Sequence, residues 1–117
     1  RTNTSLQSLG LFNETQRTEM SRLLAERLLN QAGNDAERLD LLFTLLASRK
    51  PTGRERTACM LLLESLRERY QDAEADALAL LAVGNLPRNE KHDPVEHAAW
   101  SLLATTVLAS DIALLLY

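Results

Sequence analysis

The chain of 117 residues is long enough for one domain and too short for two. With 45% apolar and 25% charged residues, it has the composition of a globular protein and not of a disordered one. The formal net charge is -3, and basic and acidic residues are interleaved, as in LRERYQDAEAD. No basic surface is therefore expected for nucleic acid or for an anionic membrane.

Helix-start signals are frequent, whereas four glycines and three prolines are too few for an all-β protein with a turn every ten residues. Four times, a Thr, Asp or Asn is followed three positions later by Glu or Gln, ahead of an apolar periodic segment. In this capping signature the first side chain accepts from free backbone N–H groups of the opening turn. The pairs are Asn13 with Gln16, Asn34 with Glu37, Thr52 with Glu55, and Asp93 with Glu96.

The first half of the chain is predicted to hold a short leading helix and three longer ones. The leading helix would span residues 4–11 and be capped from the TNT segment. Each longer helix starts at its capping signature and carries apolar residues at the spacing of one buried face. The predicted faces are Met20, Leu23, Leu24 and Leu28 in the first, Leu39, Leu42, Phe43 and Leu46 in the second, and Cys59, Leu62, Leu63, Leu66 and Tyr70 in the third.

The second half is predicted to hold a shorter helix from Ala73 to Val83, a long loop over residues 84–93 and a last helix after Asp93. Pro94 occupies the first position of that helix, where its missing N–H costs nothing. The predicted buried residues of this helix are Val95, Ala99, Leu102, Leu103, Thr106 and Val107. Brief connections favour antiparallel neighbours, so we expect an all-α fold. It would be an irregular bundle of about five helices plus the leading helix, forming a single helical domain over residues 1–117.

No pattern in the chain predicts a catalytic residue, a cofactor-binding residue or a metal site. Cys59, the only cysteine, lies in the apolar run ACMLLLESL and is predicted to be a small buried side chain. His92 and His97 are five residues apart with Pro94 between them, whereas a zinc or iron site on a helix favours histidines four apart. We expect His97 on the surface near the helix start. The chain has no GxSxG elbow, glycine-rich phosphate loop or CxxCH haem-attachment motif.

Two apolar features each leave two interpretations open. Trp100, beside Ala98 and Ala99, is either a core residue or a packing anchor for another domain, because small neighbours let another element approach the indole. The closing IALLLY either folds back onto the core or docks onto another part of a larger protein or a second copy. The stretch WSLLATTVLASDIALLLY carries Asp111 and is shorter than the ~20 uninterrupted apolar residues of a membrane span, so none is expected.

Several stretches, in the same order, resemble one protein family. RTNTSLQSLGLFNE is similar to the RTNTPLQAL stretch that opens the C-terminal part of a planctomycete-type domain of unknown function. ERLDLLFTLLASRKPTGRE is similar to that family's helix, GRPPT turn and following helix. LLAVGNLPRNEKHDPVEHAAWSLLATTVLAS is similar to its VG…PRD…DPAELAAWT…ASVLLN ending. The chain departs from the family pattern at Ser5, which replaces a proline, at residues 48–50 and in the closing LASDIALLLY.

The resemblance implies an exported location, periplasmic or extracellular, because the family is found in large exported proteins with cytochrome-c-like domains. The chain also begins at Arg1 without a methionine, so we expect a C-terminal fragment of a larger bacterial protein. Its predicted function is that of a non-catalytic accessory or interaction module, not an enzyme by itself, with upstream domains of the same polypeptide as partners. The predicted interdomain contacts are Arg1, Asn3, Trp100 and Tyr117, although Arg1 and Asn3 could instead cap the leading helix.

Three other functions stay open at this point. A contribution to a polysaccharide-degrading or other hydrolytic enzyme would need a pocket that holds Asp93, Glu96 and His97, with a shifted carboxylate pKa. A bundle that binds a small molecule or a haem edge would have an apolar cavity between helices. A homodimer would show concentration-dependent association.

Overall fold

A computed structural model describes the backbone of residues 13–115 and the side chains of residues 13–110. Within these ranges it has five helices and no strand, which confirms the all-α prediction. The helices are α2 (Glu14–Gln31), α3 (Asp35–Ala47), α4 (Gly53–Asp72), α5 (Glu74–Leu81) and α6 (Pro94–Leu115). The predicted leading helix, all of the IALLLY side chains and the contact residues Arg1, Asn3 and Tyr117 lie outside what is described.

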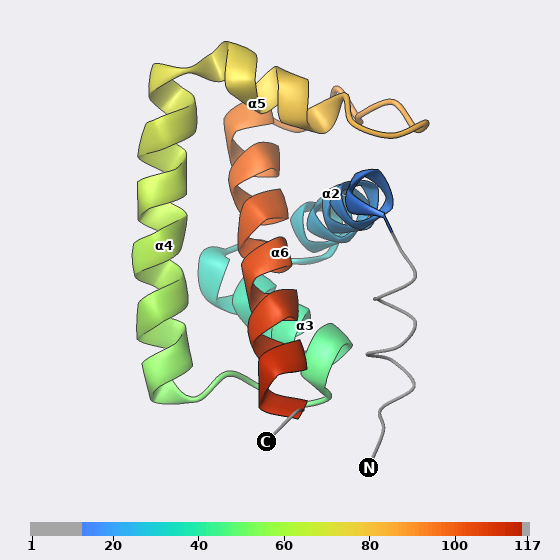
Figure 1. The fold of residues 1–117 in the computed structure, drawn as a ribbon. Helices are drawn as coiled ribbons and strands as arrows, with labels where there is room; N and C mark the ends of the chain where they lie inside the picture. Colours follow the sequence, from blue (N-terminus) through green and yellow to red (C-terminus); the bar gives the residue numbers. More distant parts are fainter. Residues whose placement is uncertain (1–12, 116–117) are drawn as a thin grey trace.

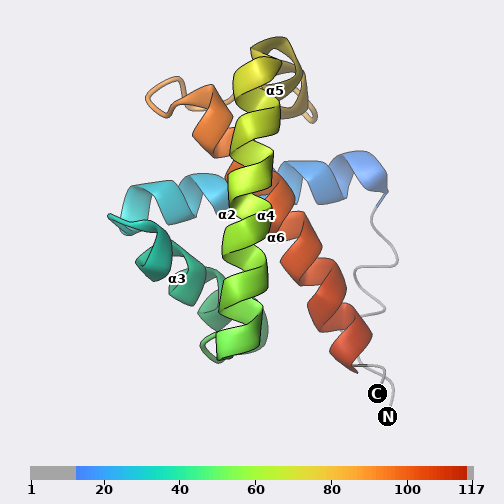
Figure 2. The same cartoon turned by 90° about the vertical axis from the view of Figure 1, so that its left-hand side faces the viewer.

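The last helix, α6, is the central element, because each of the other four helices packs against it. In Figure 1, α4 stands beside α6 and runs antiparallel to it, while α5 passes over the upper ends of both. The view turned by 90° shows α2 crossing behind α4 and α6 at a steep angle (Figure 2). The bundle is therefore irregular, because α4 and α6 form an antiparallel pair that α2 and α5 cross.

The sequence of α6 suits a helix that is surrounded by others. Trp100 is completely buried, so it is a core residue, and none of its surface is free to contact another domain. Small residues beside the indole let the neighbouring helices come close, while larger ones fill the remaining volume. Thr106, which was predicted to be buried, is exposed. The buried apolar residues of α6 are Val95, Ala98, Ala99, Trp100, Leu103, Ala104 and Val107.

The predicted buried face of α2 is partly wrong. Met20 and Leu23 are 39% and 40% exposed, whereas Ser21 and Ala25 are buried. The close approach of α2 to α6 selects small side chains at the crossing, and Thr105 of α6 donates a hydrogen bond of 2.8 Å to the Ser21 hydroxyl there. The size of the side chains at the crossing, and not their hydrophobicity alone, therefore decides which face of α2 is buried.

Two of the predicted capping signatures form completely. Asn13 accepts from the backbone N–H of Gln16 at 2.8 Å, and the Gln16 side chain accepts from the backbone N–H of Asn13 at 3.0 Å. Thr52 and Glu55 make the same reciprocal pair at 3.2 and 2.8 Å. These pairs fix where α2 and α4 begin.

The other two signatures form only in their first half. Asn34 and Asp93 accept from the N–H groups of Glu37 and Glu96, as predicted. The Glu37 carboxylate, however, accepts from the N–H of the residue before the cap. The Glu96 carboxylate is bound by Arg67 of α4. A tertiary ion pair thus takes Glu96 away from its local capping role.

The capping pair at the start of α4 gives a pH-dependent prediction. Two hydrogen bonds from the Arg49 guanidinium, and then the N–H of Thr52, lower the pKa of Glu55 to about 2. We expect Glu55→Gln to lower the unfolding free energy by up to about 1 kcal/mol near neutral pH. The ionised carboxylate stabilises the fold above its ordinary pKa, and this stability is lost as the pH falls from about 4.5 towards 2.

Urea unfolding at pH 7, 4 and 2.5 measures this effect. The difference between wild type and Glu55→Gln should shrink as the pH falls, while the exposed Glu64→Gln on the same helix should change little. A difference that stays constant across these pH values would contradict the prediction.

Candidate interaction surface

The loop between α5 and α6 is fastened to α2 by two charged side chains, which we call the loop clamp (Glu19 and Arg22). The Glu19 carboxylate accepts from the backbone N–H groups of Asn85 at 2.7 Å and Leu86 at 2.8 Å. The Arg22 guanidinium donates to the carbonyl oxygens of Val83 and, at 2.9 Å, of Leu86. Because a carboxylate takes the N–H groups and a guanidinium takes the carbonyls, both polar sides of this backbone turn are held.

The clamp needs a glycine at the turn. Gly84 has a φ of 98°, a backbone conformation that residues with a Cβ rarely adopt. A Cβ atom at this position would also overlap the Glu19 carboxylate. The VGN sequence therefore lets the backbone approach α2 closely enough for Glu19 to reach two N–H groups.

A hollow of about 340 Å³ lies beside the clamped turn, and we call it the Leu78–Leu86 hollow. Leu78 of α5 and Leu86 of the loop are 41% and 50% exposed and lie on its wall. Arg88 supplies a polar contact point at the same hollow. Its lining residues are Leu78, Leu81, Ala82, Gly84, Asn85, Leu86, Pro87 and Arg88. Two exposed leucines beside a fixed turn form a surface to which a partner could bind.

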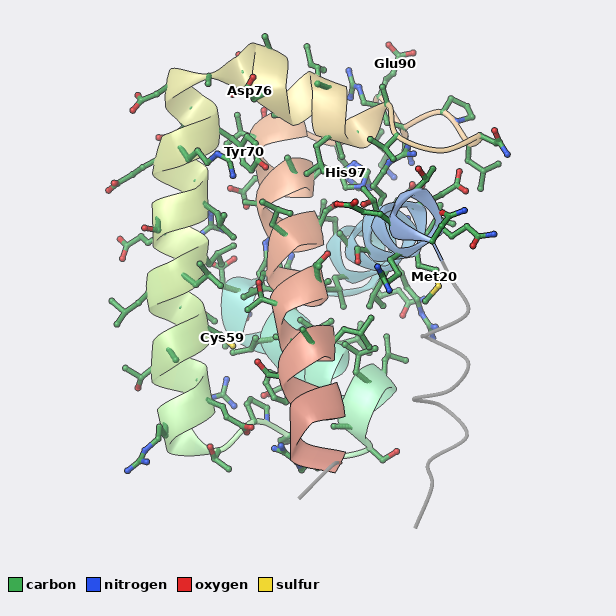
Figure 3. All side chains as sticks on the ribbon, in the orientation of Figure 1. Met20, Cys59, Tyr70, Asp76, Glu90 and His97 are labelled. Atoms are coloured by element: carbon green, nitrogen blue, oxygen red, sulfur yellow. The ribbon has the colours of Figure 1, made fainter. Side chains whose placement is uncertain are left out.

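The prediction that His97 lies on the surface is wrong, because its side chain is completely buried. Figure 3 shows it between the start of α6 and α2. Its Nε2 is 2.9 Å from the backbone oxygen of Arg22, and its ring centroid lies 6.2 Å from that of His92. His92 in turn contacts Asn30 of α2 at 2.7 Å. The first turn of α6 already lies inside the packing, so position near a helix start does not imply exposure.

The residues of the hydrolase alternative have three separate partners. Asp93 is an exposed cap, and the Glu96 carboxylate is bound by Arg67 at 2.6 and 2.7 Å. His97 faces a backbone carbonyl of α2. The sequence places these three side chains close together along the chain, but the structure does not direct them at a common point.

Arg67 joins three helices through two ion pairs. Its guanidinium contacts both carboxylate oxygens of Asp35 in α3 at 2.9 Å and both of Glu96 in α6. The hydrogen bonds from Arg67 lower the pKa of Asp35, and those to the two carboxylates raise the pKa of Arg67. One guanidinium thus donates to the oxygens of two carboxylates, as expected of a structural ion-pair network.

A second cavity, of about 160 Å³, is apolar and lies between α3, α4 and α6. Phe43, Cys59, Leu62 and Val107 line it, together with the Arg49 and Glu55 pair. Cys59 is half-buried instead of fully buried, and burial raises the pKa of its thiol, which disfavours the reactive thiolate. Figure 3 shows the cysteine on the side of α4 that faces α6. Ligand pockets are usually larger, about 300 Å³ or more, so this one suits only a small apolar group.

Two further features are absent from the described ranges of the chain, a metal site and a membrane span. No group of three or more His, Cys, Asp or Glu side chains there could hold a metal ion. None of the five described helices combines the length and the apolar character that a membrane span requires.

Neither the clamp nor the two leucines of the hollow were predicted from the sequence. Arg22 carried no signal either, because the face of α2 that it shares with Ser21 and Ala25 is recognised as buried only in the structure. Leu78 and Leu86 also carried none, since single exposed leucines are ordinary on protein surfaces.

The fold and this surface define a small all-α domain in which buried polar groups hold helices and a loop together. The chain belongs to the family described as "Protein of unknown function (DUF1553)", whose family model matches residues 1–63. The match includes α2, α3 and the first half of α4, and it supports the resemblance to a domain of unknown function. Searches of curated proteins and of solved structures found no match.

Proposed function

We propose that this chain is a non-catalytic helical interaction module of a larger exported bacterial protein and that it packs against an upstream domain through the Leu78–Leu86 hollow. The observation that carries the proposal is the pair of half-exposed leucines beside a turn that four hydrogen bonds hold to α2. A surface that is already fixed loses little conformational entropy when a partner binds.

The use of the charged side chains supports a structural role over a catalytic one. Arg67 is bound to two carboxylates, Glu19 and Arg22 hold a loop, and His97 is bound to a backbone carbonyl. A general acid or base must reach the substrate, whereas these groups are turned towards the protein itself. A contribution to a hydrolytic enzyme stays a prediction about the larger protein, and so do the exported location and the cytochrome-c-like neighbour.

The experiment is a calorimetric titration of this chain with the separately expressed upstream portion of the encoded polypeptide. We expect Leu86→Asp to weaken binding at least about 10-fold, because it places a charge where an apolar contact forms. Leu61→Asp is the matched control, since Leu61 is 65% exposed on α4 and lies outside the hollow. Its affinity should stay within about twofold of wild type.

Two results would overturn this assignment. The first is an unchanged affinity of Leu86→Asp in a variant whose circular dichroism matches wild type. The second is an absence of measurable binding to the upstream portion by the wild-type chain.

A further inference from the structure

The His97 imidazole is buried in a way that suits only its neutral form. Its Nε2 lies 2.9 Å from the Arg22 carbonyl oxygen, which can only accept, so Nε2 carries the hydrogen. Its Nδ1 is then a lone pair, and it has no hydrogen-bond partner in the described part of the chain. A second proton would therefore have to sit on a buried nitrogen with no acceptor, which is costly.

The charged groups that act on His97 come from α2 and from the loop. Burial lowers its pKa most, and the charges of His92 and Arg22 lower it further. The bond to the Arg22 carbonyl and the charge of Glu26 oppose this, but the direction of the pKa shift stays downward. Protonated His97 would thus be repelled by the charge of Arg22, and its ring centroid would lie 6.2 Å from that of His92.

Arg22 connects this histidine to the loop. Its backbone carbonyl receives the His97 hydrogen bond, and its side chain, 1% exposed, holds the carbonyls of Val83 and Leu86. His92, on the same loop, is bound to Asn30 of α2. Every contact that crowds positive charge around His97 is therefore also a contact that fastens the loop to α2.

Of the elements around His97, the loop loses the fewest buried apolar contacts when it moves away, although four hydrogen bonds to Glu19 and Arg22 must break. Its residues from Gly84 to Pro87 are exposed, whereas α2 and α6 are joined by a buried apolar interface. Local opening is easiest where few apolar contacts are lost. Withdrawal of the loop would also move the His92 ring away and let water reach the imidazole.

We propose that the loop between α5 and α6 is an acid-released strap, which detaches from α2 when His97 takes up a second proton while the helices stay packed. This inference does not depend on the proposed function. Release would, however, separate Leu86 from Leu78, so the Leu78–Leu86 hollow would exist only at neutral pH.

Amide hydrogen exchange measured by NMR between pH 7.5 and 5.0 tests the strap. After correction for intrinsic exchange rates, the protection of the Asn85 and Leu86 amides should fall at least tenfold, while that of Leu103 in the core of α6 stays constant. In His97→Gln, whose amide can still donate to the Arg22 carbonyl but cannot titrate in this range, the loop protection should persist at pH 5.0. His92→Gln is the matched control and should still release the loop.

The possible outcomes distinguish a release caused by His97 from a release caused by His92 and from unfolding of the whole domain. Loop protection that falls in His97→Gln as in wild type, or that falls only when His92 is present, would overturn the role of His97. A parallel loss of protection at Leu103 would mean that the whole domain unfolds, which also overturns a local release. If His97→Gln does not fold, the pH titration of the wild-type His97 imidazole resonances tests the proposal instead. They must titrate in step with the Asn85 and Leu86 amides, and independent titration would refute the proposal.

Discussion

Trp100→Ala is expected to lower the free energy of unfolding by about 3–5 kcal/mol, the largest effect of any single substitution considered for this chain. The indole is completely buried in the helix against which all the others pack. Its removal takes away the transfer free energy of a large side chain and leaves a cavity. The surrounding helices can close it only in part, because they are fixed by their caps and ion pairs.

Far-UV circular dichroism in urea is the suitable measurement, since Trp100 is the only tryptophan and its fluorescence is lost with it. Leu61→Ala, at a 65% exposed position on α4, is the control and should change the unfolding free energy by no more than about 0.5 kcal/mol. Equal stabilities of the two variants would show that the indole does not fill the core.

Arg67→Met should lower the free energy of unfolding by about 2 kcal/mol at neutral pH. The substitution keeps most of the aliphatic volume but leaves the Glu96 carboxylate without the guanidinium that binds it. Asp35 keeps only its longer contact with Arg38, at 3.4 Å. Breaking a fully buried pair costs about 3–5 kcal/mol and an exposed one less than about 1 kcal/mol. These three side chains are between 24% and 35% exposed, which places the expected value between the two limits.

Arg56→Met is the matched control for that variant. Arg56 also forms an ion pair, with Asp40 at 2.6 Å, but it is 37% exposed and has a single carboxylate partner there. Its replacement should cost less than about 1 kcal/mol. The Arg67→Met effect should also shrink as the pH falls below the ordinary pKa of Asp35, because the native pKa of that carboxyl is lowered and the ion pair is lost on protonation. Similar losses in both variants would contradict a special role of the network.

The helices could be predicted from the sequence because their start signals are local. Each of the four caps uses a side chain and an N–H three residues apart, so no tertiary information is needed to find them. The buried face of α2 could not be predicted in the same way. Leu23 is as hydrophobic as Leu28, and only the closeness of α6 at Ser21 decides which of them is buried.

The clamp could not be predicted from local sequence patterns for the same reason. Glu19 and Asn85 are 66 residues apart in sequence, and no spacing rule links them. The burial of His97 likewise depends on where α6 enters the packing. Glu96 shows how a tertiary contact overrides a local one, since its side chain binds Arg67 in preference to its capping role.

The central position of α6 has a consequence for what counts as a folding unit. The family match stops at residue 63, inside α4, while the helix that supplies the common packing partner begins thirty-one positions later, at Pro94. A polypeptide cut at the end of the match would keep α2 and α3 with their apolar sides facing water. The segment that the family model matches is thus shorter than the segment that packs together, and we expect α2 and α3 to pack stably only in a chain that includes α6.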